Sequence, residues 1–155
     1  MIRNSGLAIA GAFLPIKSIS KGFSLAKDNF SFCLNTSTIR EQNLGLMGEI
    51  ELAARAGYDG IEIWVRTLQD FADKGGKLSV VKKRASELGI SIENAISFPK
   101  WIVDDDSVRQ KALIQAQEEM EMLAEIGCKR IAAPPVGATD QPGLDLDTAA
   151  QRYYD

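Results

Sequence analysis

From about residue 30 onward, apolar and polar residues follow one repeated pattern. Each unit has apolar residues at intervals of three and four, then a glycine, then a short apolar run. Such a unit predicts an amphipathic helix, a glycine that ends it in the left-handed conformation, and a buried strand. The glycines are Gly57, Gly89 and Gly127, and their spacings of 32 and 38 residues each fit one strand, one loop and one crossover helix.

Three amphipathic helices are predicted from these intervals, and each has one apolar face to bury. The third follows the acidic run Asp104 to Asp106, whose carboxylates can cap free amides and favour the positive end of the helix dipole. The apolar stripes consist of Met47, Ile50 and Ala54 in the first helix, Val81, Ala85 and Leu88 in the second, and Leu113, Ala116, Met120 and Leu123 in the third.

Strands separated by helices predict an α/β fold in which helices cover a parallel sheet. We expect four strands, at about 30–35, 61–65, 90–97 and 130–133. The sequence DLDTAAQRYYD begins a further helix, with Asp145 or Asp147 as its cap. Two architectures fit this order, a doubly wound open sheet and the first half of a (β/α)8 barrel.

Composition and charge narrow the class of protein. The chain has 155 residues, of which 45% are hydrophobic and 25% charged, as in one ordinary globular domain. Its net charge of -3 gives no basic excess, so nucleic-acid binding is not expected. There is no histidine, which removes the usual catalytic base and the commonest metal ligand. Cys33 and Cys128 lie in separate elements, and we predict that both are buried free thiols.

The first 28 residues differ from the rest. A single arginine precedes the short apolar run Gly6 to Leu14, and a polar stretch without periodicity follows. The run is too short for a membrane-spanning helix, which needs roughly 20 residues. It resembles either the end of an export signal or a loosely packed tail, so residues 1–28 are left outside the fold. An export signal would make the protein exported or periplasmic; without one it would be cytoplasmic.

The predicted second strand carries an acidic residue where a buried strand should be apolar. In GIEIWV, the side chains of Ile61, Ile63 and Val65 face one way, and those of Glu62, Trp64 and Arg66 face the other. Glu62 could be a structural carboxylate paired with Arg66 or a lysine, or it could line a binding site. The indole of Trp64, and that of Trp101 after the third strand, could equally be core packing or walls of such a site.

Four stretches together resemble the sugar phosphate isomerase/epimerases with a xylose isomerase-like TIM barrel. They are FSFCLNTSTI, AARAGYDGIEIWV, ELGISIENAISFPKWIVDDDSVRQKAL and AEIGCKRIAAPPVGA, and the resemblance extends from about residue 29 to the C-terminus. It implies that residues 29–155 form the first half of a TIM barrel, truncated in the fourth helix. The polar side of the second strand would then face the barrel interior and its upper mouth.

The resemblance also implies a sugar or polyol substrate at the C-terminal ends of the strands. A carboxylate there accepts several hydrogen bonds from hydroxyl groups, and an indole gives a flat wall for the C–H face of a sugar. The turn at Pro134 and Pro135 would complete the rim. The substrate-binding residues expected on this basis are Asn35, Glu62, Trp64, Arg66, Ser97 and Trp101.

Members of the family move a proton at the carbon beside a carbonyl, with a divalent metal (Mn, Mg or Zn) polarising the oxygens. The family's metal ligands come from the second half of the barrel, so no metal ligand and no catalytic residue is assigned in this chain. We therefore expect a fragment of a metal-dependent isomerase or epimerase that is inactive alone. Its open sheet edges would favour self-association.

Other functions remain open at this point. An endonuclease of the same superfamily would use a histidine-rich zinc site, and the lack of histidine argues against it. A dehydratase or an oxidoreductase on the same scaffold is a further alternative, because fold does not fix chemistry. The alternative from another class is a non-catalytic, exported sugar-binding or interaction module that keeps the tryptophan walls and binds no metal.

Overall fold

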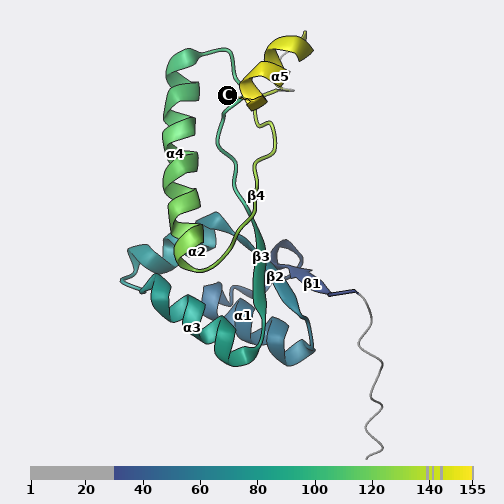
Figure 1. Ribbon diagram of the computed structural model, residues 1–155, viewed down its shortest axis with the longest axis vertical. Coiled ribbons are helices and arrows are strands. Elements are labelled where there is room, and N and C mark those ends of the chain that lie inside the picture. The colour runs from purple at the N-terminus through teal and green to yellow at the C-terminus, as the bar shows by residue number, and fades with distance from the viewer. Residues whose placement is uncertain (1–29, 139, 141, 144, 155) are drawn as a thin grey trace, which may run out of the picture.

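The computed structural model describes residues 30–138, 140, 142–143 and 145–154, and shows four strands and six helical segments in them (Figure 1). The strands are β1 (Cys33–Asn35), β2 (Gly60–Trp64), β3 (Ser91–Ile96) and β4 (Ile131–Ala132). The helices are the 3-10 helix η1 (Thr36–Gln42), α1 (Gly45–Ala56), α2 (Val65–Asp73), α3 (Leu78–Leu88), α4 (Asp106–Glu125) and α5 (Leu146–Tyr154).

The strands form one parallel sheet in the order β1-β2-β3-β4. This confirms the predicted α/β class and the strand-helix alternation. Gly57 and Gly89 end α1 and α3 with positive φ angles of 88° and 68°, as the pattern predicts for residues that need no Cβ. Asp105 caps α4 by accepting a hydrogen bond from the Val108 amide, so the acidic run acts as expected.

The helices pack on one face of the sheet. Ile61 and Ile63 of β2 and Ala95 of β3 are fully buried in a single core cluster. That cluster also contains Ile50 from α1, and residues from α2, α3 and α4. Figure 1 shows α3 and α4 on the same side of the strands. Helices on one face agree with half of a barrel, whereas a doubly wound sheet has helices on both faces.

The second strand ends earlier than its alternation predicts. Val65 begins α2 instead of ending β2, and Trp64 is the last extended residue. Val65 and Leu68 are buried at a helical interval of three, so α2 packs on the core through its own apolar face. Arg66 therefore lies on the first turn of a helix, and its predicted strand position is wrong.

The predicted apolar stripe of the third helix is only partly buried. Helix α4 instead buries Ala112, Glu119 and Leu123 against the rest of the molecule. Leu113 and Met120, expected in the core, are 39% and 49% exposed. The α4 helix thus presents an apolar side that no described element covers.

The two cysteines differ in exposure. Cys128 is buried and free, as predicted. Cys33 is free but exposed, so its predicted burial is wrong. The reason is that β1 lies at the edge of the sheet, where only Leu34 turns toward the helices and packs on the core.

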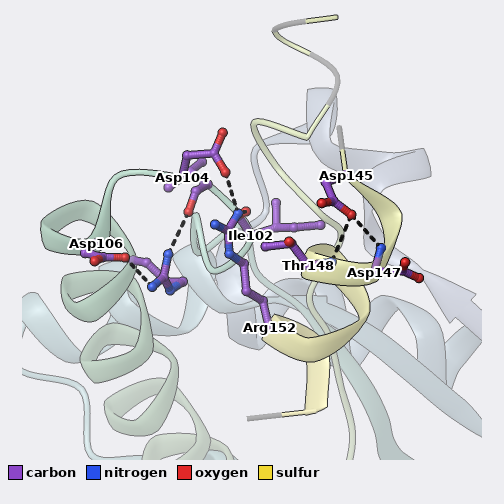
Figure 2. Close-up of polar contacts among 9 residues, drawn as sticks. Ile102, Asp104, Asp106, Asp145, Asp147, Thr148 and Arg152 are labelled. Carbon is purple, nitrogen blue, oxygen red and sulfur yellow. Dashed lines mark hydrogen bonds and ion pairs between the residues drawn. The ribbon is translucent and has the colours of Figure 1, made fainter. Parts of the chain in front are cut away.

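Helix α5 packs against the connection between β3 and α4. Figure 2 shows Arg152 reaching from α5 to the carbonyl oxygen of Ile102, at 2.7 Å, and to the carboxylate of Asp104, at 2.8 Å. Asp145 caps the helix by accepting hydrogen bonds from the amides of Asp147 and Thr148, and these bonds lower its pKa. Arg152 therefore joins helix α5 to the loop that follows β3.

The predicted export signal lies outside the described residues and stays a prediction. Within the helices that the structure does describe, none combines the length and apolar character that crossing a bilayer requires.

One buried carboxyl group in α1 is poorly solvated. Glu49 is 7% exposed, and one of its carboxylate oxygens has no hydrogen-bond partner among the described residues. Burial raises the pKa of Glu49 from 4.5 to about 7, because removing the charged form from water is costly. The folded chain therefore holds a proton on Glu49 at pH values where the unfolded chain has released it.

This difference predicts a loss of stability as pH rises from 4.5 to 7, relative to the variant Glu49→Gln. After allowing for partial screening by solvent, the wild-type free energy of unfolding should fall by about 2 kcal/mol relative to the variant. Urea unfolding of both proteins at pH 4.5 and pH 8 measures the difference. A difference that does not change with pH would show that Glu49 titrates normally.

Candidate functional site

Three polar side chains meet on the sheet face that the helices leave uncovered. Asn35 of β1 donates from Nδ2 to one carboxylate oxygen of Glu62, at 2.5 Å, and Asn94 of β3 donates to the other, at 2.8 Å. All three are half-buried, and they lie side by side because β1 and β3 flank β2. We call Asn35, Glu62 and Asn94 the carboxylate-amide cluster.

A bulge in β3 places Asn94 in this cluster. Ile61 pairs with Ile92, but Glu62 pairs with Asn94, so Glu93 is the extra residue of the irregular register. Ile92 and Ala95 both face the helices on either side of the bulge. Asn35 is fixed as well, because its side-chain oxygen accepts a hydrogen bond from the Ser37 amide. Both amides therefore have one defined orientation toward Glu62.

The structure does not support an ion pair between Glu62 and Arg66. Among the described residues, the Glu62 carboxylate has amide donors only, and Arg66 points into a separate hollow beside α2. A carboxylate whose donors are neutral keeps its negative charge uncompensated and keeps acceptor capacity for hydroxyl groups. The cluster is thus suited to hold a hydroxylated ligand.

Trp64 ends β2 next to the cluster and pairs with another ring. Its indole lies 5.3 Å from the ring of Phe98, between centroids, with the planes tilted by 48°. Phe98 is 42% exposed, so this aromatic pair forms an open apolar wall. Trp64 and Arg66 also border a hollow of about 250 Å³ that reaches Ser97.

Ser97 faces the helical side of the sheet, toward a carboxylate that the sequence analysis missed. Glu119 of α4 is 2% exposed and accepts hydrogen bonds from Ser97, at 2.5 Å, and from Gln69 and Gln115. These donors join the end of β3 to α2 and α4. A signal was present, since Ala112, Glu119, Leu123 and Ile126 follow one helical face.

Trp101 lies apart from Trp64. Its indole nitrogen donates to the carbonyl oxygen of Ala133, just after β4, at 2.9 Å. Its ring lies 5.6 Å from that of Tyr153 on α5, between centroids. Trp101 thus contacts both the segment that follows β4 and helix α5, next to the turn at Pro134.

The six predicted binding residues therefore fall into three groups. Asn35 and Glu62 meet directly, and Asn94 joins them. Trp64, Arg66 and Ser97 border the hollow at the end of β2 and β3, and Trp101 lies beyond it on the β4 side. Their role in binding stays a prediction.

The described residues do not by themselves fit a divalent metal. No group of three or more Cys, Asp or Glu side chains in the described part of the chain is placed to hold one. Both oxygens of Glu62 already accept amide hydrogen bonds. No step of the function proposed below is therefore routed through a metal.

A family model described as "Xylose isomerase-like TIM barrel" matches residues 50–155. The chain belongs to this family. The match covers β2, β3 and β4 with their helices, including two of the three cluster residues. The expected barrel family and the resemblance on which it was based are thereby confirmed.

Solved structures of similar fold include three enzymes. A probable 3-DHS dehydratase, AsbF from Bacillus anthracis, has a TM-score of 0.65 at 15% identity, over 80% of this chain and 46% of AsbF. D-psicose 3-epimerase has 0.61 at 19%, over 79% and 44%. The 3-keto-D-glucoside 4-epimerase YcjR from E. coli has 0.52 at 24%, over 70% and 42%. These identities establish a shared fold alone.

This chain spans less than half the length of each of those three proteins. No curated protein matches it. The activities of the structural neighbours are therefore not transferred to it by the comparison.

Glu119 offers a test of how the hollow is held together. The substitution Glu119→Ala leaves the buried Ser97 hydroxyl and two glutamine amides without their acceptor, and should lower the free energy of unfolding by about 3 kcal/mol. The exposed neighbour Glu118 is the matched control, and Glu118→Ala should change it by less than about 0.5 kcal/mol. Urea denaturation compares the two. Equal effects would mean that the Glu119 contacts contribute no specific stability.

Proposed function

We propose that the carboxylate-amide cluster binds the hydroxyl groups of a sugar, as part of an isomerase or epimerase that moves a proton next to a carbonyl. The observation that carries this proposal is the cluster itself. Three polar side chains from adjacent strands converge on the face without helices, and the central one is an anion held by neutral donors. That arrangement leaves acceptor sites on the Glu62 carboxylate for hydroxyl groups, and the two asparagine amides fix the position of the carboxylate.

The surroundings support a sugar as the ligand class. A pyranose or an open-chain ketose has hydroxyl groups on its edges and C–H groups on its faces. The Trp64 and Phe98 rings give an apolar wall next to the cluster, at the same C-terminal end of the strands where barrel enzymes bind substrates. The family membership and the two epimerases among the structural neighbours agree with this class.

Glu62 is assigned to binding and orientation, not to proton transfer. Its two oxygens each accept a hydrogen bond from an asparagine amide, which holds the carboxylate in one position. We infer that the described residues bind the sugar without catalysing its conversion, because Glu93, a second carboxylate on this face, is already paired with Arg130. The groups that move the proton in a complete enzyme are assigned to no residue of this chain.

A non-catalytic sugar-binding module is the second candidate. The observation that favours it is the lack of a metal-binding group among residues 30–138 and the described positions beyond. Thermal shifts with D-fructose, in the presence of Mn²⁺ and of a chelator, separate the two. Binding that is unaffected by the chelator favours the module, and binding that requires Mn²⁺ favours a metal-dependent isomerase.

The variant Glu62→Gln tests the role of the cluster. A glutamine turns a donor toward one of the two asparagine amides and removes the charge, so the affinity for D-fructose should fall at least about tenfold. The matched control is Glu51→Gln in α1, where the carboxylate pairs with Arg84 of α3 on the helical side, and its affinity should stay unchanged. Titration calorimetry measures both affinities, and thermal unfolding measures stability.

A fall in stability as large as the fall in affinity would make Glu62 a structural residue. Unchanged affinity in Glu62→Gln would place the sugar site elsewhere. Equal losses in both variants would mean that the stability of the fold, and not the cluster, determines binding.

A further inference from the structure

A buried carboxylate lines the hollow at the end of β2 and β3. Glu119 is 2% exposed, and its donors are the neutral Ser97 hydroxyl and the side-chain amides of Gln69 and Gln115. Among the described residues, no lysine or arginine forms an ion pair with Glu119. Burying a carboxylate is costly unless a cation pairs with it. The hollow is the side from which a cation can reach it.

The other polar groups of the hollow add further acceptors. Gln69 and Gln115 both donate through Nε2 to Oε1 of Glu119, so their own side-chain oxygens keep their acceptor capacity. Oε2 of Glu119 accepts from Ser97 alone, which leaves this oxygen a second acceptor position. An ammonium group carries three donors and no acceptor. The lining of the hollow is therefore complementary to an ammonium group.

The apolar side of the hollow favours the same kind of ligand. Trp64 and Phe98 both line it, and their ring centroids lie 5.3 Å apart. The face of an aromatic ring attracts a cation through the ring quadrupole, and tryptophan does so most strongly. A carboxylate and two aromatic rings in one hollow thus favour a positively charged group.

Arg66 is the one group of the lining that opposes a cation. It lies on the first turn of α2, is exposed, and forms no ion pair with the described residues. A guanidinium group on a long, exposed side chain can remain in water, where salt screens its charge. Arg66 therefore weakens the attraction of the hollow for a cation without removing it.

The hollow begins directly beyond the carboxylate-amide cluster. Glu62 pairs in register with Asn94, and two residues further along the same strands Trp64 pairs with Ile96. Trp64 and Ile96 both line the hollow. Two residues of a strand extend over roughly 7 Å. One small ligand can therefore contact the cluster and the hollow together.

We propose that the hollow binds a primary ammonium group, with Glu119 as its counter-charge, and that the ligand of the hollow and the cluster together is an amino sugar. The hydroxyl groups of this ligand bind the Glu62 carboxylate, and its ammonium group enters the hollow. The ammonium site rests on the contacts of Glu119 alone, whereas the choice of a sugar rests on the proposed function of the cluster.

Nuclear magnetic resonance can separate the two parts of the proposal. The side-chain amide signals of Gln69 and Gln115 report on the hollow, and those of Asn35 and Asn94 report on the cluster. Ethanolamine, an amine without a sugar ring, should shift the two glutamine signals only. D-glucose should shift the two asparagine signals only, and D-glucosamine should shift all four.

The affinities test the role of Glu119. D-glucosamine has an ammonium group where D-glucose has a hydroxyl group, and the wild-type chain should prefer it about tenfold or more. Glu119→Gln keeps an acceptor oxygen and removes the charge, so this preference should disappear. The control Glu118→Gln removes an equal charge from an exposed position of α4 and should keep the preference. Titration calorimetry measures the affinities, and circular dichroism confirms folding.

Arg66→Gln provides a second variant with the opposite sign. Removal of the competing cation should raise the preference for D-glucosamine over D-glucose roughly twofold. Since Arg66 is exposed, this variant keeps the test decisive even where Glu119→Gln fails to fold. A preference that falls in Arg66→Gln would contradict an ammonium group in the hollow.

The outcomes distinguish the ammonium site from the sugar function. Equal wild-type affinities for the two sugars, or glutamine signals that ethanolamine does not move, would overturn the ammonium site. Glutamine shifts without any asparagine shift in D-glucosamine would leave the ammonium site intact and contradict sugar binding at the cluster. A preference that survives in Glu119→Gln, or that is lost equally in Glu118→Gln, would overturn the assignment of Glu119.

Discussion

Two asparagine side chains hold both oxygens of Glu62 from the strands on either side. This contact sets the polarity of the whole sheet, because it fixes which face of β2 is polar and which is apolar. With Glu62 bound to Asn35 and Asn94, Ile61 and Ile63 must face the other way, where they form the centre of the core with helices α1 to α4. A shift of β2 by one residue would place a carboxylate in that core and four helices against a polar surface.

The same contact explains why one face of the sheet has no helices. A carboxylate with only two donors keeps unfilled acceptor sites, which water or a polar ligand can fill on an uncovered face and an apolar packed helix cannot. The helical face has its own buried carboxylate, Glu119, but there three donors from α2, α4 and the end of β3 hold it. The two acids therefore have different surroundings, since Glu62 lies open to a ligand on the uncovered face and Glu119 also joins secondary-structure elements.

Much of the fold could be predicted from local pattern, and the misses have physical causes. The strand order and the capping glycines depend on residues close in sequence. Helix α2 was missed because Val65 continues the alternation of β2, and only burial of Leu68 shows that the helical period takes over. Asn94 was missed because the bulge at Glu93 breaks the alternation along β3. The exposure of Cys33 and Met120 depends on what covers the sheet edges, which no local pattern contains. Of the predicted site, Asn35 and Glu62 meet, whereas Ser97 turns to Glu119 because β3 has shifted its faces after the bulge.

The central claim is that the uncovered face of the sheet is a ligand-binding face organised by Glu62. A crystal structure of the chain grown with D-fructose tests it most directly. The account predicts sugar hydroxyl groups within hydrogen-bond distance of the Glu62 carboxylate, with the Asn35 and Asn94 amides still donating to it. Sugar bound only on the helical side, or a Glu62 side chain turned toward the helices, would contradict the account.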